Sequence, residues 1–139
     1  MSARAVCFAV VAGLAVSSAV PAEASDAQLR YVIEHRTSAI VAALKSADLR
    51  TTARAGAKCA RMARRSGRLV SHLKPDSDAG ARARHLAVKG FGLIRIGCRT
   101  MILAANSHGA SRKRLVAVSL QRLYDGGYQL GMALGQFAS

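Results

Sequence analysis

Helical periodicity, interrupted at only two places, is the feature that most constrains the fold of this chain. From about residue 25 onward, apolar and small residues recur at spacings of three and four, which gathers them on one face of an α-helix. The alternation of apolar and polar residues that marks a half-buried strand is missing. The two breaks are Lys74–Asp78, which contains Pro75, and Asn106–Ser111, which contains Gly109. The pattern therefore predicts an all-α fold.

Four helical segments are expected between these breaks. Ser25 or Asp26 is suited to cap the first, and Ser111 to cap the last, with Gly109 at the C-terminus of the third. Asp48 either caps the second helix or lies inside one long first helix. After the first segment, the expected helices are about Asp48–His72, Asp78–Ala105 and Arg112–Phe137. Short connections between them predict a small up-down helical bundle of about four helices.

The apolar positions predict which face of each helix is buried. In the first helix they are Leu29, Ile33, Ile40 and Leu44. The fourth helix has a strict four-three alternation, which predicts a packing seam, at Val116, Leu120, Leu123, Gly127, Leu130, Leu134 and Phe137. Adjacent glycines at 126 and 127 each cost about 1 kcal/mol against alanine, so we expect a weak point in that helix.

The first 24 residues have the pattern of an export signal. Arg4 provides a positive start, Ala5–Val16 is an apolar run, and Ala22–Ala24 is a small-x-small cleavage site. The apolar run is too short for a membrane-spanning helix. We therefore expect residues 1–24 to be a cleaved signal peptide and residues 25–139 to form a single basic helical domain, located in the periplasm or secreted.

Three cysteines are present, and the expected cleavage removes Cys7. Cys59 and Cys98 remain, and an even number of cysteines in a small exported domain favours a disulfide. If the second and third helices form a hairpin around Pro75, these two residues lie almost opposite each other. The alternative is a pair of buried thiols that behave as small apolar residues.

A large excess of positive charge points to an anionic partner. The chain has 21 Lys and Arg against 7 Asp and Glu, a formal net charge of +14. Cations at helical spacing form a ridge along the second helix, at Arg50, Arg54, Lys58, Arg61, Arg65 and Arg68. Guanidinium groups chelate two oxygens of a phosphate, sulfate or carboxylate. The bland alternatives are a solvated helix face and an arginine content that reflects genome composition.

Two further clusters are candidate binding or packing features. Arg112, Lys113 and Arg114 lie where cations oppose the helix dipole, so they either extend the anion-binding surface or form an ordinary loop edge. Gly127, Gly131 and Gly135 share one ridge at spacings of four. Such a ridge allows close approach of another helix, within the chain, in a second copy or at a membrane.

Catalytic motifs are missing from the sequence. It contains no zinc-protease, nucleophile-elbow, Walker or Cys-x-x-Cys pattern, and we expect neither enzymatic activity nor a metal or cofactor. The favoured function is an exported protein that binds an acidic protein, lipid headgroups or an envelope polyanion. Alternatives are a self-associating envelope protein using the glycine ridge, and a secreted cationic effector acting on membranes. If the N-terminus is no export signal, nucleic acid becomes a partner, although the ridge has no aromatic residue to stack on bases.

Overall fold

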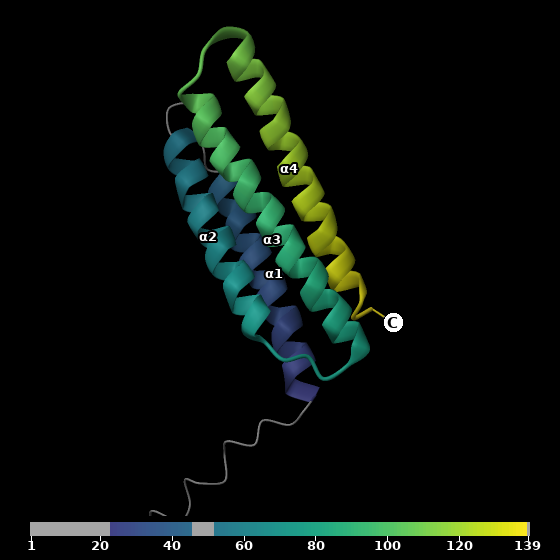
Figure 1. Cartoon of the computed structure of the whole chain (residues 1–139). Helices are drawn as coiled ribbons and strands as arrows, with labels where there is room; N and C mark the ends of the chain where they lie inside the picture. Colours follow the sequence, from purple (N-terminus) through teal and green to yellow (C-terminus); the bar gives the residue numbers. More distant parts are fainter. Residues whose placement is uncertain (1–22, 46–51, 139) are drawn as a thin grey trace, which may run out of the picture.

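Four helices run alternately up and down along a common axis (Figure 1). The structure is a computed structural model that describes residues 23–45 and 52–138. Its helices are α1 (Glu23–Lys45), α2 (Thr52–His72), α3 (Asp78–Ala105) and α4 (Gly109–Gly135). No strand occurs in the described ranges. The predicted all-α bundle is confirmed, and the bounds of the third helix agree with the prediction.

The helices do not pack evenly around the bundle. α3 makes the most extensive contacts, with α4 on one side and α2 on the other, while the backbones of α2 and α4 stay apart. α1 packs mainly on α2 and only lightly on α3 and α4. In Figure 1, α1 accordingly lies behind α2 and α3. α2 and α4, with their outer faces, therefore lie on opposite sides of α3.

The core lies where apolar stripes from all four helices meet. Leu29, Ile33 and Ile40 of α1 are almost completely buried, as the spacing predicted. Val70, Phe91, Ile94 and Leu130 are among the buried residues of the other helices that complete the cluster. Burying an aliphatic side chain stabilises a fold by about 1.5–3 kcal/mol, so this stripe explains why α1 docks at all.

Small residues let α3 approach both of its neighbours closely. A Cβ added at Gly56 of α2 would lie 2.9 Å from the carbonyl oxygen of Cys98. Between α3 and α4, a Cβ on Gly126 would lie 2.8 Å from the Gly90 carbonyl oxygen. The predicted disulfide joins Cys59 to Cys98, whose Cα atoms are 5.9 Å apart. The α2–α3 hairpin is thus both closely packed and covalently closed.

The N-terminal caps differ from the predictions. α1 begins at Glu23, before Ser25 and Asp26. Asp26 instead accepts hydrogen bonds from the backbone N–H of Asp76, at 3.1 Å, and from the Ser77 hydroxyl. Ser77 is the N-cap of α3 and accepts from the Gly80 N–H at 2.9 Å. A carboxylate is favourable there because a helix N-terminus has free N–H groups and a positive dipole end.

The start of α4 is also earlier than predicted. His108 is its N-cap, without a side-chain hydrogen bond, and the predicted cap Ser111 lies inside the first turn. Gly109 opens α4 with φ of +58° rather than ending α3, whose C-cap is Asn106. A left-handed φ has no steric cost for glycine, so the chain reverses direction within three residues and α4 gains one more turn.

The buried stripe of α4 is rotated from the predicted seam. Its buried residues are Ser119, Gly126, Leu130 and Ala133. Val116, Leu120 and Gly127 of the predicted seam are exposed, while Leu123, Leu134 and Phe137 are partly buried. The helix is continuous through both glycines. Small residues facing α3 allow a closer helix contact than the larger residues of the predicted stripe, and this contact holds the glycine pair in the helix.

A basic groove between α2 and α3

The outer face of α2 is lined by cations. Arg54, Lys58, Arg61, Arg65 and Arg68 are all exposed, whereas Arg50 lies outside the described residues. The opposite face of the helix is buried, at Ala55, Gly56, Cys59, Ala63, Ser66 and Val70. This division follows from the helical repeat, because the small residues and the cations occupy opposite sides of the same turns.

These cations have no carboxylate to neutralise them. α2 contains no Asp or Glu. In the part of the chain that the structure describes, the only ion pair joins Arg30 to Glu34 on α1. The ridge therefore presents an uncompensated positive field to solvent, which attracts anions and is weakened by salt.

A shallow groove of about 320 Å³ runs beside this ridge, between α2 and α3. Arg64, Arg68 and Ser71 of α2 and Arg95 of α3 contribute its polar side chains. Gly67 and Gly92 also line it, and a Cβ at Gly92 would meet no atom within 4 Å. The absence of side chains at these two positions leaves room for a ligand beside the three arginines.

Two of the three groove arginines fall outside the predicted ridge. Arg64 lies at the side of α2 that turns toward α3, and Arg95 belongs to a different helix. The sequence contained one indication that Arg64 and Arg95 lie close together. In an antiparallel hairpin that pairs Cys59 with Cys98, Arg95 lies opposite residue 62, which is less than one turn from Arg64. Spacing within a single helix does not reveal a site that two helices share.

The groove's chemistry suits binding rather than proton transfer. Its lining contains no Asp, Glu, His or Cys. Arginine stays protonated throughout the physiological pH range, so it neither gives nor takes a proton. Three guanidinium groups around one groove fit a phosphate, sulfate or carboxylate group, each of which accepts two parallel hydrogen bonds from one arginine.

The predicted cluster at the start of α4 is not part of this groove. Arg112 lines a separate, mainly apolar pocket of about 190 Å³ with Met101, Ala104, Val116 and Leu120, among others. Lys113 and Arg114 are exposed. Successive residues of a helix point about 100° apart, so three adjacent cations diverge instead of converging on one ligand.

The predicted glycine ridge is exposed. A Cβ added at Gly127, Gly131 or Gly135 would meet no atom within 4 Å. No helix among the described residues therefore packs on this ridge, and the close contact with α3 uses Gly126.

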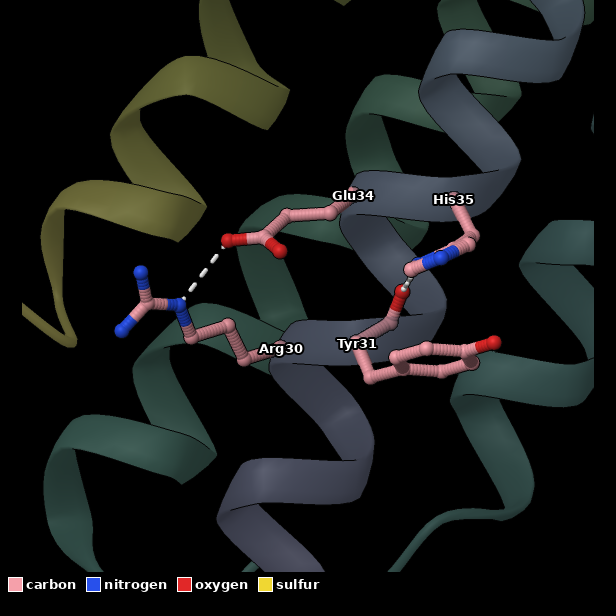
Figure 2. A network of polar contacts seen from close by, with 4 residues as sticks. All are labelled: Arg30, Tyr31, Glu34 and His35. Carbon is pink, nitrogen blue, oxygen red and sulfur yellow. Dashed lines mark hydrogen bonds and ion pairs between the residues drawn. The ribbon is translucent and has the colours of Figure 1, made fainter.

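A polar cluster on α1 is confined to that helix (Figure 2). Arg30 Nε donates to Glu34 Oε1 at 2.9 Å, and His35 Nδ1 donates to the Tyr31 carbonyl oxygen at 3.0 Å. The Tyr31 and His35 rings stack with centroids 3.7 Å apart. Each contact joins residues four apart, so each pair stabilises α1 by a few tenths of a kcal/mol. Glu34 and His35 bond to Arg30 and Tyr31 and not to each other.

Neither metal ligands nor similar proteins identify a reaction. No group of three or more His, Cys, Asp or Glu side chains that could hold a metal ion occurs within the described ranges. None of the described helices is long and apolar enough to cross a membrane. Comparison of the chain with protein families, curated proteins and solved structures finds no match. The residues of the groove are therefore the features of the chain that point to a function.

Proposed function

We propose that this protein is a non-enzymatic binding protein whose basic groove and adjoining α2 ridge hold an anionic partner. The observation that carries the proposal is the convergence of Arg64, Arg68 and Arg95 on one groove without a carboxylate in its lining. Stability alone does not favour this arrangement, because like charges repel each other across the groove. An anion that enters between them relieves that repulsion.

The ligand group is a phosphate, sulfate or carboxylate presented by a larger partner. The ridge residues Arg54, Lys58, Arg61 and Arg65 continue the positive surface along α2 beyond the groove. A single small anion would occupy the groove alone, whereas a polyanion, an acidic protein or a lipid surface also uses the ridge. An extended partner therefore explains both features.

Export is a second part of the proposal and is supported by the sequence of residues 1–24. In that compartment the partner is an envelope polyanion, an anionic lipid surface or an exported acidic protein. The test is the unreduced intact mass of protein isolated from its own host, with the cell fraction recorded. We expect a chain that begins at Ser25 and has lost two hydrogens through the bridge. A full-length chain with free thiols in the cytosol would overturn the export proposal.

The groove is tested by charge reversal with a matched control. The test variant is Arg64→Glu, Arg68→Glu and Arg95→Glu. The control replaces three scattered exposed arginines, Arg99, Arg114 and Arg122, with glutamate. Each reversal replaces one positive by one negative charge and lowers the net charge by two, so both variants go from +14 to +8. Only the first places carboxylates in the groove.

The probes are polyphosphate, a heparin oligosaccharide, a polyglutamate peptide and phosphatidylglycerol vesicles, with binding measured by calorimetry or cosedimentation. We expect the groove variant to lose at least about 30-fold in affinity for the preferred probe, or about 2 kcal/mol. The control should lose less than about threefold. Equal losses in both variants would show that net charge, rather than the groove, attracts the anion.

A further inference from the structure

The outer face of α4 is apolar, although it faces solvent. Leu120, Tyr124 and Tyr128 are 59%, 72% and 59% exposed. At 100° per residue they lie on the same side of the helix as the glycine ridge and Ala117, away from the buried residues Gly126 and Ala133. An exposed stripe that combines large apolar and small residues over five turns marks an interaction surface.

This stripe also lacks charge along its length. Between Leu115 and Gly135, the charged residues of α4 are Arg122 and Asp125, and both fall outside the stripe. α2 presents its basic ridge to solvent, and the outer side of α3 includes Lys89 and Arg99. Two copies of a protein with net charge +14 repel each other wherever such faces meet.

We propose that the outer face of α4 binds a second copy of this chain in an antiparallel, two-fold arrangement. The charge distribution favours this occupant because an α4–α4 contact brings two neutral surfaces together. It also points the two basic ridges away from each other, since α2 and α4 lie on opposite sides of α3. A C2 interface uses the same patch on both copies, as a single self-complementary stripe requires.

The N-terminus of α4 decides between parallel and antiparallel pairing. A parallel pair would bring Arg112, Lys113 and Arg114 of both copies to the same end, which concentrates six cations. An antiparallel pair separates the two clusters by nearly the length of the 27-residue helix, about 40 Å. It also places each cluster near the C-terminal end of the other α4, where the helix dipole is negative.

The composition of the stripe suits helix packing. Gly127, Gly131 and Gly135 have open space around them, so a facing helix can approach without meeting a side chain. Tyr124 and Tyr128 contribute large contact areas with few rotatable bonds, which is why tyrosine is common in interfaces. In the antiparallel arrangement centred between them, Tyr124 of each copy faces Tyr128 of the other. One helix face per copy is a small interface, so we expect a dimer with Kd on the order of micromolar.

Sedimentation velocity of the purified protein over a range of concentrations tests the proposal. The test variant is Tyr128→Glu, and the matched control is Val118→Glu. Val118 is an exposed apolar residue of the same helix, 44% exposed, that points away from the stripe. Both changes lower the net charge equally. We expect a concentration-dependent dimer for the wild-type protein and the control, and at least a tenfold weaker dimer for Tyr128→Glu.

Three results would overturn the proposal. The first is a wild-type protein that stays monomeric at about 100 micromolar, which is above the expected Kd. The second is a Tyr128→Glu variant that dimerises normally. The third is a dimer that both variants weaken equally. A vesicle-binding experiment tests the other occupant that such a face could take, an anionic membrane. If the wild-type protein is monomeric in solution and Tyr128→Glu abolishes cosedimentation with phosphatidylglycerol vesicles, the stripe binds lipid and the dimer proposal fails.

Discussion

Gly126 and Gly131 lie on opposite sides of α4, five residues apart in the chain. Gly126 lies directly against α3, where an added Cβ would approach the side-chain atom Ile94 Cγ1 to 2.6 Å and the Gly90 carbonyl oxygen to 2.8 Å. Gly131 has no neighbour within 4 Å of such an atom. The same residue type therefore permits helix packing at one position and only weakens the helix at the other.

Alanine substitution separates these two roles. Gly126→Ala forces α3 and α4 apart, and we expect the free energy of unfolding to fall by about 1–3 kcal/mol. Gly131→Ala removes backbone freedom from the unfolded chain, and we expect a gain of about 0.5–1 kcal/mol. Thermal denaturation at low protein concentration, where the monomer dominates, measures both. Shifts of the same sign would contradict the observed rotation of α4.

Asp26 is the second residue whose role depends on a distant segment. Its carboxylate ties α1 to Asp76 and Ser77 at the start of α3. We expect Asp26→Ala to lower the free energy of unfolding by about 1–2 kcal/mol, because hydrogen bonds to a charged group are lost. Asp125→Ala is the control, since Asp125 accepts only a local bond from Gln121 at 2.8 Å. Urea denaturation that finds equal effects would exclude an α1–α3 role for Asp26.

At the scale of elements, the α2–α3 hairpin is the most constrained unit. Its disulfide joins residues 39 apart in sequence. In the chain-entropy account, a loop of that length stabilises the native state by about 3–4 kcal/mol. We therefore expect Cys59→Ala with Cys98→Ala, and likewise reduction of the wild-type protein, to lower the free energy of unfolding measured by urea denaturation by that amount. A reduced protein with unchanged stability would contradict a constraining role for the bridge.

α1 is the least constrained element. It packs mainly on α2, while α3 contacts both α2 and α4 extensively. Segments with fewer buried contacts open at lower free energy. In hydrogen-exchange mass spectrometry we expect amides near Ile40 to exchange well before those near Ile94. Simultaneous exchange of both regions would indicate that the bundle opens as one cooperative unit.

At the scale of the whole molecule, charge and apolar surface are segregated. The basic ridge of α2 and the neutral stripe of α4 lie on opposite sides of α3, so the two proposed functions do not compete for surface. An antiparallel dimer would carry two basic grooves on its opposite outer sides, which a polyanion reaches together only by wrapping around the dimer. Such bivalency raises apparent affinity without any new contact, provided that the partner spans both sites.

Salt dependence tests the electrostatic account for the intact protein. Binding of polyphosphate should release counterions, so log K should fall linearly with log salt concentration. Reversal of Arg64, Arg68 and Arg95 should reduce the magnitude of that slope by about three, or one unit per lost contact. Calorimetry or anisotropy titrations between low and physiological salt provide the slope. An unchanged slope would show that these arginines do not contact the anion.

Local pattern determined a large part of the fold. Pro75 predicted the α2–α3 turn, the apolar spacing of α1 predicted its buried side, and the even pair of cysteines predicted the bridge. These features depend on neighbours within one or two turns or on covalent geometry. The N-caps were wrong for a different reason. Ser25, Asp26 and Ser111 are all suitable caps by local chemistry. The Asp26 carboxylate instead accepts from the distant backbone N–H of Asp76. α4 begins before Ser111 because Gly109 adopts a left-handed φ.

The sequence by itself determined the helices, the hairpin and a basic face on α2. Periodicity records which residues share a side of one helix, and that information is local. Only the tertiary structure decided that Arg95 joins Arg64 in a groove, that Gly126 rather than Gly127 meets α3, and that none of the described helices covers the outer stripe of α4. These outcomes depend on how each helix rotates about its axis, which close packing between helices settles and a single helix does not.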